Sequence, residues 1–193
     1  MRPAAALLGC CLLLAAGCSG NVQVGAPPGE PDCASSADTV SDALILVAQT
    51  VPTAQQVPCL RPLPLGWSFT RLDAQSGRTR VYLRSADRDG DHTVTISLTG
   101  SCDLAGAQEV RTDRPAARRY DRVPPGGAGY RGDQYYVFQG GCITYHFELR
   151  GRAGADAAAT VAAGFGFVSR STVAAAVSQR SHGRLTLDPG GQS

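Results

Sequence analysis

The sequence lacks several features that usually identify an enzyme. It contains no lysine, so all 18 of its basic residues are arginines, which together with abundant alanine and glycine indicates a GC-rich genome. No C-x-x-C pair occurs, which weighs against zinc binding and thioredoxin-like redox chemistry. The G-x-S-x-G elbow, the H-E-x-x-H motif, the P-loop and the dinucleotide fingerprint are also missing. We therefore expect no cofactor and assign no catalytic residue.

Charge is nearly balanced, with 18 basic and 16 acidic residues. This balance gives no electrostatic reason to expect nucleic acid or a strongly acidic ligand as a partner. The densest basic segment runs from Arg111 to Arg122, but Asp113 and Asp121 interrupt it. We interpret it as a salt-bridged surface; binding of anionic lipid heads or wall polymers is the alternative.

No apolar run is long enough to span a membrane. Residues 1–17 consist of a basic start at Arg2, an apolar run from Ala4 to Ala16 and a small-residue end, the three-part layout of a secretory signal. The run holds about thirteen residues, whereas a membrane-spanning helix needs roughly 20. The segment is therefore predicted to direct export.

The end of this signal resembles the lipobox of bacterial lipoproteins. The residues from Leu14 to Cys18 read LAAGC, with small residues directly before the cysteine. The resemblance implies cleavage before Cys18, a diacylglycerol and palmitate-type acyl anchor on its thiol, and location on the outer face of the cell membrane. Cleavage by an ordinary signal peptidase, followed by secretion, is the alternative. Residues 140–147 (GGCITYHF) are also similar to stretches in uncharacterised lipoproteins of GC-rich Gram-positive bacteria, a resemblance that implies no known activity.

Four cysteines remain after the signal and Cys18 are set aside: Cys33, Cys59, Cys102 and Cys142. In an oxidising exterior an even number of cysteines predicts two disulfides, for which three connectivities are possible. A helix over residues 36–50 would rise about 22 Å, and the eight extended residues that follow it would return about 26 Å. This geometry favours pairing of Cys33 with Cys59, which leaves Cys102 to pair with Cys142.

The chain is predicted to have three parts. Residues 1–17 form the signal, residues 18–32 form the lipidated cysteine and a flexible Gly/Pro-rich tether, and residues 33–190 form one disulfide-stapled domain. The helix over 36–50 begins with a cap at Ser35 or Ser36.

Apolar and polar residues alternate through the middle of the domain, which predicts an antiparallel sheet. The expected strands cover 67–72, 78–84, 92–98, 117–122, 134–139 and 142–149, with a loop over residues 124–133. From residue 153 the chain is predicted to be helical to about Phe167, with a second helix capped near Ser169 or Ser171, and a short strand over 185–187. The predicted fold class is α+β: an antiparallel sheet of about six strands, flanked by an N-terminal helix and a C-terminal helical pair.

Two polar groups are candidates for chemistry. Asp87, Asp89 and Asp91 alternate as in the start of a calcium loop, but His92 and Leu98 occupy the glycine and glutamate positions of that loop, so a solvated hairpin turn is preferred. His146 and Glu148 lie two apart on the polar side of a strand and are a candidate proton-transfer pair; ordinary strand alternation is the competing interpretation. No metal site is assigned.

We expect a membrane-anchored, noncatalytic binding or accessory module of the cell envelope. Its expected partners are the membrane, through covalent lipid, and an envelope protein, a wall component or an apolar ligand. The alternative is a secreted envelope hydrolase with an unrecognised Asp/Glu/His site, which would require a third group to join His146 and Glu148 in one cleft.

The lipid anchor can be tested by mass spectrometry of the membrane-bound protein. A diacylglycerol adduct is expected on Cys18, and the Cys18→Ser variant is expected to leave the membrane fraction because one covalent lipid group supplies the attachment. An unmodified Cys18, or a C18S variant that stays on membranes, would contradict the anchor.

Overall fold

The computed structural model describes residues 29–34, 36–87, 90–114, 116–124, 126, 129–151 and 154–188. The predicted signal, Cys18 and most of the predicted tether lie outside this range. In sequence order the elements are η1 (Ala37–Thr39), α1 (Asp42–Thr50), β1 (Gln56–Leu60), β2 (Trp67–Gln75), β3 (Arg78–Asp87), β4 (Gly90–Thr99), β5 (Gln108–Val110), β6 (Ala117–Arg122), β7 (Tyr130–Phe138), β8 (Gly141–Leu149), α2 (Gly154–Ala162), β9 (Phe165–Ser169) and α3 (Arg170–Arg180). No helix within the described residues is long and apolar enough to cross a bilayer.

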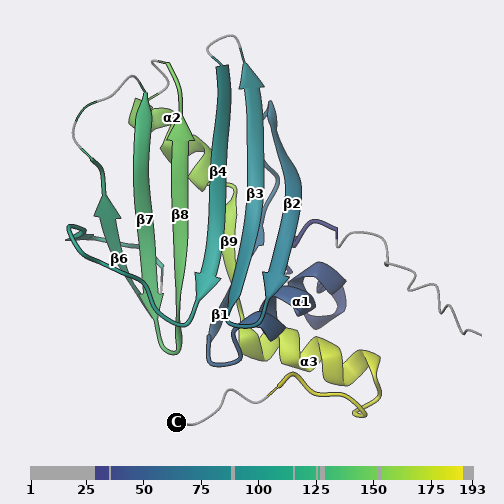
Figure 1. Cartoon of the computed structure of the whole chain (residues 1–193). Helices are drawn as coiled ribbons and strands as arrows, with labels where there is room; N and C mark the ends of the chain where they lie inside the picture. Colours follow the sequence, from purple (N-terminus) through teal and green to yellow (C-terminus); the bar gives the residue numbers. More distant parts are fainter. Residues whose placement is uncertain are drawn as a thin grey trace, which may run out of the picture.

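The fold is a mixture of helices and antiparallel strands, as the sequence predicts. A seven-stranded sheet has the order β2-β3-β4-β8-β7-β6-β5, and β1 pairs with β9 in a separate two-stranded sheet (Figure 1). The prediction of about six strands was wrong. It included β2, β3, β4, β6, β7 and β8 but missed the three-residue β5 and both strands of the smaller sheet.

The middle of the large sheet joins two segments that are far apart in sequence. Strand β8 lies between β4 and β7, and Ile96 of β4 is paired with Tyr145 of β8. Every second residue of β8 from Ile143 to Leu149 is buried, while the residues between them reach solvent. Because side chains alternate between the two faces of a strand, this pattern gives the sheet one apolar face and one polar face.

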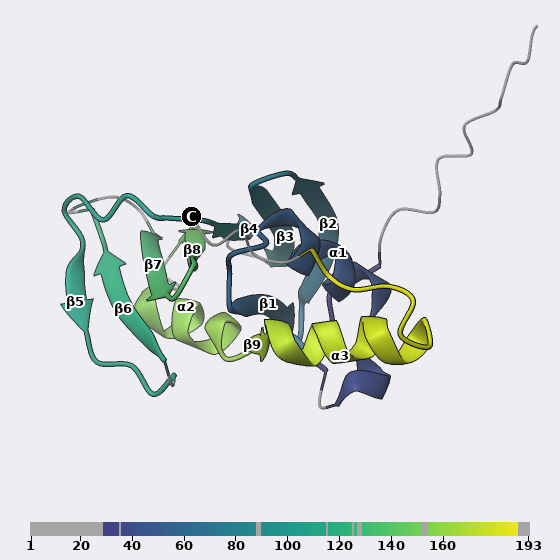
Figure 2. The same ribbon diagram turned by 90° about the horizontal axis from the view of Figure 1, so that it is seen from below.

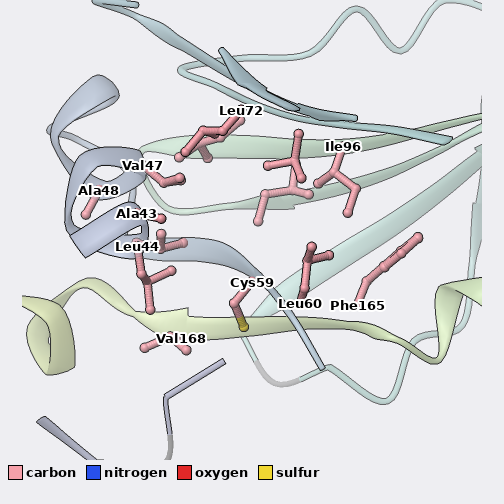
Figure 3. Packing of buried hydrophobic residues seen from close by; sticks show 14 of the residues in the cluster. Ala43, Leu44, Val47, Ala48, Cys59, Leu60, Leu72, Ile96, Phe165 and Val168 are labelled. Atoms are coloured by element: carbon pink, nitrogen blue, oxygen red, sulfur yellow. The ribbon is translucent and has the colours of Figure 1, made fainter. Parts of the chain in front are cut away.

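Helices and the β1–β9 pair cover the apolar face. Viewed from below, α2, β9 and α3 lie on one side of the large sheet (Figure 2). Leu44 and Val47 of α1, Leu60 of β1 and Phe165 of β9 belong to one buried cluster with Ile96 of the sheet (Figure 3). All five side chains are at most 2% exposed, so burial of this layer is the main source of stability.

The helix predicted over residues 36–50 is divided into two pieces. Residues 37–39 form the short helix η1 with the predicted Ser36 as its N-cap, and α1 begins at Asp42 with Ser41 as its own N-cap. The Ser41 hydroxyl accepts a hydrogen bond from the Leu44 amide at 3.2 Å. Val40 lies at the break and is buried, so tertiary packing at this residue replaces a continuous helix.

Three further expectations about local structure were wrong. Residues 165–169 form a strand and not a helix, because the backbone groups of β9 bond to β1 and its glycines weaken a helix. Tyr130–Asp133, expected in a loop, begins β7. Residues 185–187 form no strand; Leu187 is nevertheless buried.

Both predicted disulfides are present. Cys33 is bonded to Cys59 and Cys102 to Cys142, with Cα–Cα distances of 4.8 and 5.8 Å. The first disulfide fastens the N-terminal segment to β1, where the Leu60 amide also donates to the carbonyl of Pro31. Backbone pairing therefore begins within the last residues that the sequence assigned to the tether.

The Cys33–Cys59 disulfide packs directly on Gly166 of β9. A Cβ atom at position 166 would lie 2.4 Å from the Cys33 sulfur and 3.0 Å from the Cys59 sulfur. Glycine is thus required here by the close approach of the disulfide and not by its own backbone angles.

The Gly166→Ala variant is expected to lower the free energy of unfolding by about 1–3 kcal/mol, because neither the sulfurs nor the paired backbone can yield easily. Gly100→Ala is the matched control, since a Cβ at position 100 meets no atom within 4 Å. Denaturant unfolding of both variants is the measurement. Equal denaturation midpoints for the two variants would show that the disulfide leaves room for a Cβ atom at position 166.

Candidate functional site

Among the described residues no helix covers the second face of the large sheet, which is lined by polar side chains. Figures 1 and 2 show the helices gathered on the opposite side. The central strands contribute Thr93, Thr95 and Ser97 from β4, and Thr144, His146 and Glu148 from β8, which stand opposite one another in the β4–β8 register. We call this surface the polar face.

One end of the polar face is crossed by the segment that joins β4 to β5 (Figure 1). The Cys102–Cys142 disulfide attaches this segment to the start of β8, and the guanidinium of Arg122 donates to the carbonyl of Ala105 at 3.2 Å. The segment is therefore held covalently along one end of the polar face. The charged side chains lie on the part of this face that the segment leaves open.

Asp133 of β7 is the centre of a charged cluster on this face. Its Oδ1 atom lies 2.6 Å from Nδ1 of His146. Its Oδ2 atom accepts hydrogen bonds from both Nε and Nη2 of Arg122, at 3.1 and 2.8 Å, and from the hydroxyl of Tyr135 at 3.1 Å. Asp133 is only 14% exposed, and these donors replace the water that it loses.

The cluster continues outward to Glu148. Its Oε1 atom lies 3.6 Å from Nε2 of His146 and 3.7 Å from Nη2 of Arg131. Strand register explains the convergence, because Arg122 is opposite Asp133, Asp133 is opposite His146 and Arg131 is opposite Glu148. Residues directly opposite in an antiparallel sheet share a face, so side chains from β6, β7 and β8 meet here.

The cluster shifts the pKa values of its members in opposite directions. Burial alone would raise the pKa of Asp133, but hydrogen bonds from His146 and Arg122 hold it down at about 2. The hydrogen bond to Asp133 raises the pKa of His146, against the effect of its partial burial. Burial and the nearby Asp133 charge raise the pKa of Tyr135 to about 12. The favoured state is therefore a charged carboxylate, a protonated imidazole and a neutral phenol.

This arrangement holds charges in place and does not prepare a base. Nδ1 of His146 is hydrogen-bonded to Asp133 at 2.6 Å and Nε2 lies 3.6 Å from Glu148, and the raised pKa of His146 favours its protonated form over the free base. Among the described residues no hydroxyl or thiol is hydrogen-bonded to His146. The described part of the chain also contains no group of three or more His, Cys, Asp or Glu side chains placed to hold a metal ion.

Arginines stack on tyrosines at three places on the polar face, one of them within the Asp133 cluster. The guanidinium carbons lie 4.1 to 5.5 Å from the ring centroids in the pairs Arg71–Tyr82, Arg118–Tyr120 and Arg122–Tyr135. The first two arginines also form ion pairs, with Asp73 and Glu109. Stacking and pairing hold these long side chains against the sheet. The basic segment predicted to be salt-bridged is indeed paired at Arg118, Arg119 and Arg122.

Sequence reasoning found part of this cluster. His146 and Glu148 do lie together, but the residues that hold them, Asp133, Arg122 and Arg131, were not selected. Asp133 was assigned to a loop, and only the pairing of β7 with β8 places it opposite His146. The start of β7 carries no apolar alternation in the sequence, because the buried positions there are Gly132 and Gln134.

The other sequence candidates are not brought into this cluster. Asp87 ends β3 and Asp91 lies in β4, where it pairs with Arg84 at 2.8 Å; Asp89 lies outside the described residues. Cys18 also lies outside them. Comparison with protein-family models, curated proteins and solved structures finds no match to this chain.

The pKa shift of Asp133 has a consequence for stability. Its folded-state pKa is below the ordinary value of 3.8, so its contribution to the free energy of unfolding, about 2 kcal/mol, is present above pH 3.8 and is lost as the pH falls toward 2. The pKa of His146 is raised, so its contribution is present below the ordinary value of 6.5 and is lost as the pH rises through its folded-state pKa.

Asp133→Asn is expected to lower the pKa of His146, because the carboxylate that stabilises the imidazolium is removed. NMR titration of the imidazole ring measures the change. Asp73→Asn is the matched control: it removes a carboxylate from the same face that pairs with Arg71 rather than with His146. If His146 titrates identically in the wild type and both variants, Asp133 does not set its charge.

Proposed function

We propose that this chain is a lipid-anchored binding module on the outer face of the cell membrane, and that the polar face binds an envelope protein. The observation that carries the proposal is the helix-free polar face with its fixed arrangement of tyrosines, arginines and carboxylates. The anchor rests on the resemblance of residues 14–18 to a lipobox, and the two disulfides are consistent with an oxidising exterior.

The composition of the polar face favours a protein partner. Tyrosine and arginine are enriched among the residues that dominate protein interfaces. Tyr82 and Tyr120 are half-buried under arginines, so they are already ordered and lose little side-chain entropy on binding. Arginines alternate with carboxylates across this surface, which favours a partner of mixed charge over a polyanion.

An apolar ligand fits the structure less well. Such a ligand would need an enclosed space between the sheet and the helices. That layer is filled by side chains such as Leu44, Ile143 and Phe165, each fully buried. The envelope hydrolase is also less well supported, because His146 is flanked by two carboxylates and lacks a bonded nucleophile among the described residues.

The proposal can be tested by photo-crosslinking in intact cells. A photoreactive residue replaces Thr93, which is exposed on β4 in the polar face, and in a second strain replaces Ala175, which is exposed on α3. A discrete adduct is expected only from position 93, which lies on the polar face, because α3 lies on the other side of the large sheet (Figure 2).

Digestion identifies the class of partner in this adduct. If protease removes the added mass, the partner is a protein. If a wall hydrolase removes it, the partner is a wall polymer and the proposed protein partner is wrong. The absence of an adduct at position 93, or equal adducts at both positions, would contradict the polar face as the binding surface.

A further inference from the structure

The segment between β1 and β2 exposes an unusual amount of apolar surface. Residues 61–66 read Arg-Pro-Leu-Pro-Leu-Gly, and Leu65 is 104% exposed. It occupies the corner of a turn in which the Trp67 amide donates to the Pro64 carbonyl at 3.1 Å and Gly66 has a φ of +86°. Two prolines stiffen this segment, so Leu65 is held outward and loses little conformational freedom on inserting elsewhere.

The residues that flank this turn line a hollow with aromatic walls. The hollow has a volume of about 680 Å³, and its lining includes Leu63, Trp67 and Phe69. Trp67 and Phe69 lie on the apolar side of β2, the outermost strand of the large sheet, where burial is incomplete. Exposed Leu65 and half-buried Trp67 therefore lie two residues apart at one edge of the molecule.

The N-terminal segment reaches the domain at this same hollow. Glu30 and Asp32 line it, and the Cys33–Cys59 disulfide fixes them there. Residues 19–29 connect Glu30 to Cys18. A chain of about eleven residues spans at most about 40 Å fully extended and about 18 Å as a coil. Lipid on Cys18 therefore keeps the hollow within a short distance of the bilayer.

We propose that Leu65 and Trp67 insert into the outer leaflet of the membrane that holds lipidated Cys18. This inference rests on the anchor in the proposed function and adds an orientation to it. Tryptophan favours the membrane interface, where its ring is apolar and its N–H remains hydrated. The tether makes insertion intramolecular, so a small apolar contact is sufficient.

Electrostatic attraction contributes little to this contact. Glu30, Asp32 and a single basic residue, Arg61, line the hollow, and burial together with the Asp32 charge raises the pKa of Glu30. The surface is therefore not basic, and the occupant it fits is acyl chain rather than an anionic headgroup.

Docking at β2 would orient the polar face. In the strand order, β2 is one edge of the large sheet and β5 is the other. With the β2 edge at the membrane, the Asp133 cluster on β6, β7 and β8 lies in the half of the sheet away from the bilayer. It would then face an incoming partner rather than the lipid.

Trp67 provides a direct measurement because it is the only tryptophan in the chain. The full-length lipoprotein, purified from membranes, is reconstituted into phosphatidylcholine vesicles with and without brominated acyl chains, which quench nearby tryptophan. We expect a blue-shifted emission and a clear loss of intensity in the brominated vesicles. Equal emission in the two vesicles, with the protein bound to both, would overturn the inference while leaving the anchor intact.

Two leucine variants identify the contact. Leu65→Asp is expected to abolish the quenching; circular dichroism should be unchanged because the side chain is fully exposed. Leu185→Asp is the matched control, since Leu185 is 63% exposed but lines a different groove with Ile45 and Val177. Quenching that survives L65D, or that is lost equally in L185D, would overturn the assignment to this loop.

Mass spectrometry of the same sample separates this inference from the proposed function. If Cys18 carries no lipid, the native anchor is refuted. The chain from Cys18 onward can then be coupled to a maleimide-bearing lipid, because its other four cysteines are bonded to one another. Quenching of Trp67 in that coupled protein would still support insertion of the loop, and its absence would refute it.

Discussion

Ile96, Ile143, Tyr145 and Phe165 are removed from water between the seven-stranded sheet and the β1–β9 pair, and this contact determines the rest of the architecture. Covering one face of the sheet requires the helices and the small sheet to lie on the same side. The other face is left to water, and its side chains must be polar or charged. The Cys33–Cys59 disulfide packs on Gly166 within the covering layer, so the N-terminal segment and the two paired strands are held together at one point.

The exposed face shows how an antiparallel sheet organises charge. Arg122, Asp133 and His146 stand on three neighbouring strands at matching register positions, so Asp133 contacts both basic side chains without a cleft. The carboxylate accepts hydrogen bonds from both basic groups and remains ionised. Such a cluster keeps its charges paired, because each basic group has an acidic neighbour. The same pairing limits net charge on the surface, which agrees with the balanced composition of the whole chain.

Periodicity in the sequence was sufficient for the long strands and for the disulfide pairing, because alternation over β4 and β8 is strong and the distance from Cys33 to Cys59 is short along the chain. It was insufficient where tertiary contacts decide the structure. Phe165–Ser169 follows an alanine-rich helix and becomes a strand only because Gln56–Leu60 pairs with it. The helix over 36–50 breaks at Val40 and Ser41, whose backbones are extended, because the Ser41 hydroxyl caps a new helix there. Asp133 could not be joined to His146 without knowing that β7 and β8 form a hairpin, since the spacing of thirteen residues has no meaning by itself.

The position of β8 in the strand order also governs when the protein can fold. The central strand of the large sheet is the last of its seven to be synthesised, and β1 must wait for β9, more than a hundred residues later in the sequence. Contacts between such distant segments make closure slow, because a long loop must be ordered before the pairing is formed. The chain consequently has no stable core until nearly all of it is available. Late assembly of this kind is compatible with passage through a narrow export channel as an extended polypeptide, followed by folding and disulfide formation on the far side.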